Sequence, residues 1–270
     1  MTTTQNAGAG RTVSAGIDAG IAYTKVVILK DGAIAGRGIG PTGGVDRREM
    51  IDEVYKRALI DAGLNPGEVD RVAVTGKGKH NADFAGKRIS EQLAAKKAVA
   101  LLCPDATCVV SAGADETMVS VLTEDGGAGE YAFNQKCTAG LGLFLEYMAD
   151  RLSMDIEELG SLADAGEGAE TAVNEGCVVF AELDALSLLN HGASPAEVGR
   201  VVNRAAAARV SSVINDITHP SVERVALIGG LANNKAFVKA LESLTGIRFI
   251  VPDDAGYAGA LGAALAADAG

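Results

Sequence analysis

The first part of the chain alternates short apolar segments with turn residues. Residues 13–18, 25–30 and 33–38 are apolar runs rich in β-branched side chains. Asp31 and Gly32, which separate the second run from the third, are typical of a hairpin turn. The pattern therefore predicts a meander of three strands.

After this meander, helical and extended patterns alternate. Asp46 followed by Glu49 resembles a capping box, and apolar residues at helical spacing continue to about residue 62, where Gly63 ends the helix. The elements predicted next are a strand, a helix and a strand over residues 69–75, 90–102 and 107–111.

The first pattern then recurs about a hundred residues further along. The recurring apolar runs and their turn fall at residues 109–115, 118–122, 125–127 and 130–133. Each copy has an acid near a glycine at its first bend, Asp18 with Gly20 and Asp115 with Gly113. We interpret the recurrence as an internal duplication.

Beyond Asn134 the pattern is mostly helical. Helices are expected over residues 141–152, 155–164 and 178–190, and a long helix is expected after Ser194 and Pro195. Two strand–helix units follow. A strand at 224–228 precedes a helix from about residue 233, and a strand at 248–251 precedes a helix at the end of the chain. We expect an α/β fold with a disordered tail (1–11), a first lobe (12–106, with part of the last helix) and a second lobe (107–270).

Composition excludes several classes of function. A net charge of −11 without any cluster of basic and aromatic residues argues against nucleic-acid binding. The chain has four irregularly spaced cysteines, no apolar signal segment at its start and no run of 18 apolar residues. We therefore expect a cytoplasmic protein without a membrane span.

The duplicated bends carry the candidate nucleotide chemistry. Neither a P-loop nor a glycine-rich dinucleotide fingerprint is present in the sequence. In a strand–turn–strand loop, backbone N–H groups can surround phosphate oxygens while a carboxylate such as Asp18 binds Mg²⁺ through water. A turn acid beside a glycine is also common in ordinary loops. The candidate nucleotide-binding residues are Gly16, Asp18, Gly20, Thr24, Lys25, Gly113, Ala114, Gly229, Gly230 and Asn233, and the candidate catalytic acids are Asp18, Asp115 and Glu116.

These loops, together with the strand that ends at Gly229 and Gly230, resemble the two phosphate motifs and the adenosine motif of the actin, sugar-kinase and Hsp70 superfamily. The three motifs occur in the same order along the chain as in that superfamily. The resemblance implies an actin-like (ribonuclease H-like) ATPase fold with two duplicated lobes around a nucleotide cleft.

Two cysteines precede amphipathic helices. Cys137 and Cys177 each end a loop immediately before a helical pattern, where a thiolate is favoured by the helix dipole. Both could instead be small buried residues. If they are metal ligands, two thiolates cannot complete a four-thiolate iron–sulfur site, and a partner must supply the rest. We interpret Cys103 and Cys108 as core residues.

The segments Lys136-Cys137-Thr138-Ala139-Gly140-Leu141-Gly142 and Gly176-Cys177-Val178-Val179-Phe180-Ala181-Glu182 resemble the BadF/BadG/BcrA/BcrD family. Residues 75–79 (Thr-Gly-Lys-Gly-Lys) are similar to that family's Thr-Gly-Tyr-Gly-Arg segment. The resemblance implies a [4Fe-4S] cluster shared by two homologous subunits, with Cys137 and Cys177 as ligands. It also implies ATP and Mg²⁺ as cofactors, a ferredoxin-like electron donor and a catalytic reductase or dehydratase as partner.

One departure separates the branches of the family. The second loop reads Ser111-Ala112-Gly113-Ala114-Asp115-Glu116, which resembles the D-type subunit of benzoyl-CoA reductase more than the Asp-Ile-Gly-Gly-Gln-Asp loop of activators and A-type subunits. The D-type interpretation implies an A-type partner chain. The alternatives are a homodimeric activator of a 2-hydroxyacyl-CoA dehydratase, an actin-like small-molecule kinase, and a subunit that does not hydrolyse ATP.

Overall fold

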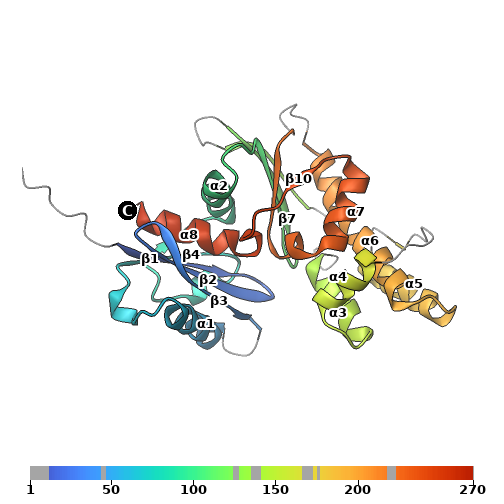
Figure 1. Ribbon diagram of the computed structural model, residues 1–270, viewed down its shortest axis with the longest axis horizontal. Helices are drawn as coiled ribbons and strands as arrows, with labels where there is room; N and C mark the ends of the chain where they lie inside the picture. The colour runs from blue at the N-terminus through green and yellow to red at the C-terminus, as the bar shows by residue number, and fades with distance from the viewer. Residues whose placement is uncertain are drawn as a thin grey trace, which may run out of the picture. The chain divides into compact units, whose positions relative to one another are not determined.

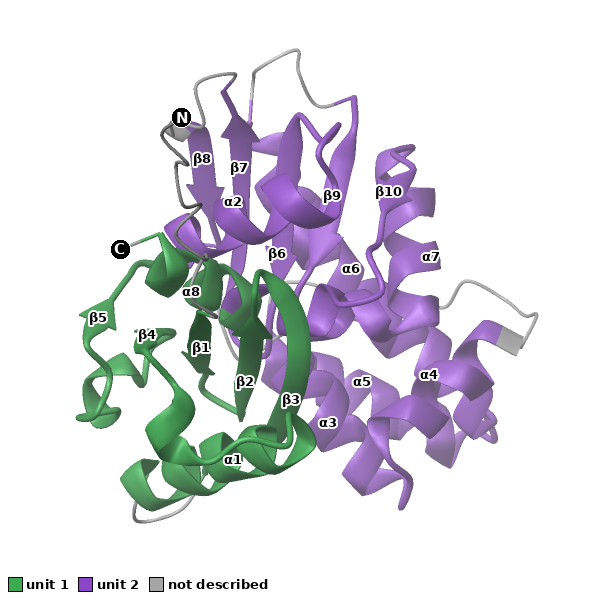
Figure 2. Ribbon diagram, turned by 60° about the vertical axis from the view of Figure 1, so that its left-hand side comes forward, with its two compact units in different colours: residues 1–90, 260–270 green, residues 91–259 purple. Residues whose placement is uncertain are grey.

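The chain divides into two compact units, each built around its own β-sheet (Figure 2). The computed structural model describes residues 12–43, 47–123, 128–134, 141–165, 173–174, 177–217 and 223–269. The first unit comprises Met1–Ser90 with Ala260–Gly270, and the second comprises Glu91–Gly259. The predicted tail at residues 1–11 and the predicted helix cap at Asp46 lie outside the described residues.

The sheet of the first unit contains the predicted meander. Its strands are β1 (Val13–Ala19), β2 (Tyr23–Lys30), β3 (Ala33–Pro41), β4 (Arg71–Thr75) and β5 (Lys87–Arg88), in the order β3-β2-β1-β4-β5. Strands β1 to β3 pair antiparallel, whereas β4 is parallel to β1 and to β5. The short strand β5 was not predicted from the sequence.

Two helices cover this sheet (Figure 1). Helix α1 (Arg47–Asp61) buries Ile51, Val54, Tyr55, Ala58 and Leu59, as the helical spacing predicted, because these positions form one apolar stripe. Strand β1 also contacts the C-terminal helix α8 (Ala258–Asp268), most of which belongs to this unit. Short 3-10 helices at Pro66–Glu68 and Lys79–Asn81 complete the unit.

The sheet of the second unit repeats this topology. Its strands are β6 (Cys108–Ala112), β7 (Thr117–Leu122), β8 (Ala128–Phe133), β9 (Val225–Ile228) and β10 (Phe249–Ile250), in the order β10-β9-β6-β7-β8. Strands β6 to β8 pair antiparallel, and β9 is parallel to β6. The strand order matches that of the first unit element for element, which confirms the predicted duplication.

Helices account for most of the rest of the second unit. They are α2 (Glu91–Leu102), α3 (Gly142–Arg151), α4 (Ile156–Ala165), α5 (Val178–Asn190), α6 (Pro195–Asn215) and α7 (Lys235–Thr245), with 3-10 helices at Gly230–Asn233 and Ala255–Tyr257. Helix α2 contacts β6 and β7, so it belongs to this unit and the division falls after Ser90.

The long helix α6 lies at the centre of the second unit (Figure 1). Ser194 caps it, and the Glu197 carboxylate accepts a hydrogen bond from the Ser194 backbone N–H at 2.7 Å, which completes a capping box. Helices α3, α4, α5 and α7 all contact α6. Among the residues described, no helix is both long enough and apolar enough to cross a membrane.

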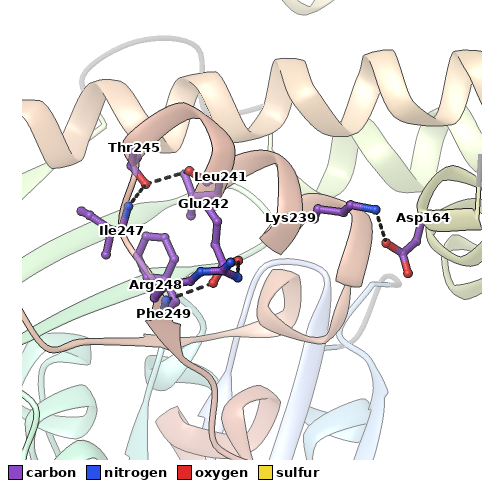
Figure 3. Close-up of polar contacts among 8 residues, drawn as sticks. All are labelled: Asp164, Lys239, Leu241, Glu242, Thr245, Ile247, Arg248 and Phe249. Carbon is purple, nitrogen blue, oxygen red and sulfur yellow. Dashed lines mark hydrogen bonds and ion pairs between the residues drawn. The ribbon is translucent and has the colours of Figure 1, made fainter. Parts of the chain in front are cut away.

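Helix α7 is attached to its surroundings by polar contacts (Figure 3). The Lys239 Nζ atom lies 3.5 Å from the Asp164 carboxylate on α4. At the end of α7, the Glu242 carboxylate accepts a hydrogen bond from the Phe249 backbone N–H at 3.2 Å and forms an ion pair with Arg248 at 2.9 Å. The two Glu242 contacts hold the edge strand β10 and the residue before it against α7.

Candidate nucleotide and metal sites

The first acidic loop joins β1 to β2. Asp18 lies opposite Lys25 in the antiparallel pair and opposite Thr75 in the parallel pair, so the three side chains share one face of the sheet. Desolvation by burial raises the pKa of the Asp18 carboxyl, and the positive charge of Lys25 opposes this rise. In such a pair the acid can bind a divalent cation, and the lysine can neutralise phosphate charge.

The turn after Asp18 is tight. The Gly20 backbone N–H donates to the Tyr23 carbonyl at 3.1 Å, and a Cβ at Gly20 would lie 2.6 Å from the same oxygen. A side chain at this position would therefore open the turn, so glycine is required for the strand–turn–strand geometry.

The end of β4 encloses Asp18. Gly76 has φ +89°, and a Cβ there would lie 2.4 Å from the Ala19 carbonyl oxygen and 2.8 Å from Asp18 Oδ1. The Gly78 N–H donates to the Ala19 carbonyl at 2.8 Å. The Thr75 hydroxyl is buried and has no hydrogen-bond partner within the described part of the chain. Residues 75–78 therefore form part of the same loop cluster, although the sequence patterns assigned them no role.

The second acidic loop joins β6 to β7. The Gly113 N–H donates to the Glu116 carbonyl at 2.9 Å, which is the same turn contact as that of Gly20. Gly113, Ala114, Asp115 and Glu116 are all partly exposed. Asp115 and Glu116, two of the three candidate catalytic acids, therefore lie in a turn that a phosphate group could reach.

Contacts from Asn134 and from the start of α3 fix this second loop. The Asn134 side-chain oxygen accepts from the Thr117 N–H at 2.7 Å, and its amide nitrogen donates to the Asp115 carbonyl at 3.3 Å. The N–H groups of Gly142 and Leu143 donate to the Gly113 and Ala114 carbonyls at 3.3 and 2.9 Å. The loop backbone is thus bonded to residues on two other elements.

The candidate adenosine residues lie beside the second acidic loop. Strand β9 is parallel to β6, with Ile228 opposite Ser111, so Gly229 and Gly113 follow neighbouring strand ends. Gly229 has φ +95°, and a Cβ there would lie 2.3 Å from the Ala112 carbonyl oxygen. Gly230 and Asn233 are exposed. The second unit thereby brings together the predicted residues Gly113, Ala114, Asp115, Glu116, Gly229 and Gly230.

Two predicted binding residues have packing roles. A Cβ at Gly16 would lie 2.0 Å from the Ala260 carbonyl oxygen, because α8 packs directly against β1 at this position. The Thr24 hydroxyl is buried and hydrogen-bonded to the Thr42 hydroxyl at 3.0 Å. The structure accounts for both residues without a ligand. Thr42 gave no signal in the sequence.

The cysteines differ in their surroundings. Cys177 is partly exposed, caps the N-terminus of α5 and donates its backbone N–H to the Asn174 side chain at 2.7 Å. Cys137 lies outside the described residues. Cys103 and Cys108 are buried, as predicted for core residues, and burial raises the pKa of the Cys108 thiol to about 11. The described residues contain no group of three or more metal-binding side chains.

The first turns of α5 expose apolar side chains next to Cys177. Val179, Phe180 and Leu183 are 58%, 57% and 56% exposed. Exposed apolar groups at this density are typical of a contact surface for another protein. A thiol beside such a surface suits a metal site that is completed by a partner.

Comparison with known proteins shows which ATPases the chain resembles. The model of the BadF/BadG/BcrA/BcrD ATPase family matches residues 15–267. The chain is 33% identical over 254 residues to the 2-hydroxyisocaproyl-CoA dehydratase activator of Clostridioides difficile, covering 93% of this chain and 92% of the activator. It is 30% identical over 264 residues to the D-type subunit of benzoyl-CoA reductase from Thauera aromatica, covering 94% of this chain and 92% of the relative.

A solved structure of the same activator with bound ADPNP superposes with a TM-score of 0.88 and 31% identity, covering 95% of this chain and 94% of the activator chain. The similarity extends over both units of the chain, and the fold is that of actin-like ATPases, as predicted.

Proposed function

Because the chain belongs to the BadF/BadG/BcrA/BcrD ATPase family, we propose that it hydrolyses ATP to drive electrons toward a catalytic subunit that acts on a coenzyme A thioester. The observation that carries this proposal is the pair of matching loops, one with Asp18 and Lys25 and the other with Asp115 and Glu116. Hydrolysis of ATP needs a group that holds Mg²⁺ and a group that orients the attacking water, and each loop supplies acids that suit one of these tasks.

In the first loop, Asp18 would bind Mg²⁺ through water and Lys25 would neutralise phosphate charge. The backbone at both residues is held by the pairing of β1 with β2, so the loop needs little reorganisation when ATP binds. The orphaned Thr75 hydroxyl beside Asp18 fits a role as a donor to a metal-bound water or a phosphate oxygen.

In the second loop, a carboxylate of Asp115 or Glu116 would orient the attacking water. The activators' glutamine-containing loop is absent here, so an acid has to perform this task. Asp115→Asn and Glu116→Gln, measured separately, identify the residue: the variant of the water-orienting acid loses about a hundredfold or more in kcat while its ATP affinity stays within about threefold.

The chain would also supply half of a [4Fe-4S] site. Cys177 fits this role because its thiol lies at a helix N-terminus, partly exposed and beside an apolar surface. Cys137 is its proposed companion, on the basis of its sequence motif. The bound cluster would carry one electron at a time at low potential. The remaining two thiolates would come from a homologous subunit, and a ferredoxin-like protein would supply the electrons.

For the partner, we favour the D-type arrangement, in which this chain pairs with an A-type chain of a benzoyl-CoA-type reductase. The Gly113-Ala114-Asp115-Glu116 loop supports this arrangement. A second candidate is a homodimeric activator of a 2-hydroxyacyl-CoA dehydratase, which the full-length similarity to the C. difficile activator supports.

Anaerobic purification of the full chain, together with any subunit that co-purifies with it, tests these proposals. The expected result is a brown protein with about four irons per dimer, and loss of iron in both Cys137→Ser and Cys177→Ser. Cys108→Ser is the matched control and should retain iron. Native mass then separates the candidates, because an activator forms a dimer with itself whereas a D-type chain requires an A-type partner.

The other outcomes point elsewhere. Colourless material that binds ATP and phosphorylates a small molecule would support an actin-like kinase and refute the electron-transfer role. Cluster-loaded material without any ATPase activity would identify a subunit that does not hydrolyse ATP.

A further inference from the structure

A chain of contacts leads from the second acidic loop to the helix that begins at Cys177. Its first step is at the start of α3, where Gly142 and Leu143 donate backbone hydrogen bonds to Gly113 and Ala114. A Cβ at Gly142 would lie 3.0 Å from the Ala114 Cα atom. The loop and the helix are thus in direct backbone contact, and α3 cannot shift against the loop without breaking these bonds.

The second step is a polar cluster between α3 and α5. The Tyr147 hydroxyl donates to Glu182 Oε1 at 2.6 Å. Arg151 donates from Nε to the Tyr147 oxygen at 2.7 Å, and its guanidinium carbon lies 4.8 Å from the centre of the Tyr147 ring. Tyr147 is therefore clamped between a cation on its own helix and a carboxylate on α5.

The third step is α5 itself. Glu182 lies just over one turn from Val178, where the helix begins, and Cys177 is the N-cap. A displacement of Glu182 along the helix axis would displace Cys177 too, because a helix transmits axial motion as a rigid element. All three steps lie within the second unit.

We propose that Tyr147 is a positioning residue that couples the conformation of the second acidic loop to the position of Cys177. The inference rests on the proposed function only in that nucleotide phosphate binds at residues 113–116. Phosphate binding there would shift the Gly113 and Ala114 carbonyls, and with them α3, and the Tyr147–Glu182 hydrogen bond would pass the shift to α5.

A second route to Cys177 runs through α6. The Arg209 guanidinium lies 5.5 Å from the centre of the Phe144 ring and donates to the Asn174 carbonyl at 3.4 Å, and Asn174 in turn accepts the Cys177 N–H. The contact of this route with α3 is the cation–π contact between Arg209 and the Phe144 ring. It therefore offers a comparison in which the same two helices are connected by a less directional contact.

The test measures the reactivity of Cys177 in the full-length, metal-free chain. Alkylation of Cys177 by iodoacetamide is followed peptide by peptide, with and without Mg²⁺ and a non-hydrolysable ATP analogue. The wild type is expected to change its rate by about threefold or more on binding the analogue. Tyr147→Phe keeps the ring but removes the hydroxyl, and it leaves the partly exposed Arg151–Glu182 ion pair at 3.5 Å as a weaker link between the two helices. Its ratio of alkylation rates with and without the analogue should therefore fall toward one, while its affinity for the analogue stays unchanged.

Further variants separate coupling from general structural damage. Glu182→Gln retains an acceptor for the Tyr147 hydroxyl and should keep most of the response, whereas Glu182→Ala should lose it. Thr245→Val removes a hydroxyl with two hydrogen bonds at the end of α7 (Figure 3) and should respond like the wild type. Arg209→Met should also retain most of the response.

If the analogue changed the alkylation rate of Tyr147→Phe by the same factor as that of the wild type, the inference would be overturned. It would also be overturned if Arg209→Met lost this change while Tyr147→Phe retained it. A wild-type chain that binds the analogue without any change in Cys177 reactivity would overturn it too. Because the alkylation does not require iron, the two proposals fail separately: a chain that takes up no cluster under anaerobic conditions but shows the expected ratios would refute the electron-transfer proposal and leave the coupling intact. Failure to bind the nucleotide analogue would refute both.

Discussion

The two acidic loops, β1–β2 and β6–β7, share the same backbone geometry but carry their acids at different positions. Gly20 and Gly113 make the same turn contact, with the carbonyls of Tyr23 and Glu116. The similarity extends to Gly76 and Gly229, which both have a positive φ and would bring a Cβ to 2.4 and 2.3 Å from the carbonyl that ends the first strand of their sheets. The backbone framework of each loop is therefore repeated almost atom for atom.

The side chains on these frameworks differ. In the first unit the acid, Asp18, lies in the strand before the turn glycine, opposite Lys25. The equivalent pair in the second unit is Ser111 and Met118, and the acids Asp115 and Glu116 follow the turn glycine. A charge in a strand is rigid, whereas an acid in a turn moves with its loop. We therefore propose that the first loop binds the metal and that the second responds to phosphate.

The largest expected effect comes from removing the charge that distinguishes the first loop. Asp18→Asn should lower Mg²⁺-dependent ATP hydrolysis by about a hundredfold or more, because the metal loses the carboxylate proposed to position it. Ser111→Ala, at the equivalent position of the second unit, should retain activity within about threefold. Equal losses of ATPase activity in both variants would show that metal binding is not confined to the first loop. Steady-state phosphate release measures both.

The shared framework should be equally sensitive in both units. Gly76→Ala and Gly229→Ala each introduce a Cβ against a backbone carbonyl at a positive φ, so each should reduce the free energy of unfolding by about 2–3 kcal/mol. Gly67→Ala, where a Cβ meets nothing within 4 Å, is the control. Urea unfolding measures all three. A loss in only one of the two loop variants would contradict the structural equivalence.

The sequence predicted the framework better than the contacts made by its side chains. Periodicity located nearly every helix and strand, because each buries one continuous apolar face. The equivalence of Gly76 and Gly229 was not predicted, because a strand followed by glycine is common in sequences. The two glycines become equivalent only through the parallel pairing of β4 with β1 and of β9 with β6.

Predictions for individual site residues were limited by tertiary contacts. Gly16 is one of the predicted nucleotide-binding residues, but its small size is also required by α8, which is distant in sequence and packs directly against it. The Tyr147–Glu182 hydrogen bond likewise joins two helices whose patterns are unrelated. Such pairings depend on how helices pack, which a single sequence does not encode locally.

A smaller effect is expected at Asn134, which ties the second loop to β7 and β8. Asn134→Ala should cost about 1–3 kcal/mol of stability, because the buried Thr117 N–H and the partly buried Asp115 carbonyl lose their hydrogen bonds to the Asn134 side chain. Asn134→Asp keeps the acceptor for the Thr117 N–H but loses the donor to the Asp115 carbonyl. Compared with Asn134→Ala, it should therefore recover part of the stability, whereas the rate of ATP hydrolysis should be reduced equally in both variants. Full recovery of ATPase activity in Asn134→Asp would show that the bond to Asp115 is dispensable.

The smallest expected effect is on the pH dependence of stability without nucleotide. Burial raises the pKa of Asp18 above its ordinary value of 3.8, so the folded state binds the proton more tightly than the unfolded state does. The ionised carboxylate therefore costs stability at pH values above the raised pKa, and this cost disappears as the pH falls through the raised pKa toward the ordinary value. Asp18→Asn removes the ionisation, so it should be more stable than the wild type near neutral pH.

The advantage of Asp18→Asn should shrink in urea unfolding curves recorded at successively lower pH, down to about pH 4. Ser111→Ala should show no such trend, since the equivalent position in the second unit carries no charge. An Asp18→Asn variant that is less stable than the wild type at neutral pH would mean that attraction by Lys25 outweighs desolvation. The ionised Asp18 carboxylate would then stabilise the folded protein in the absence of metal, rather than lower its stability through desolvation.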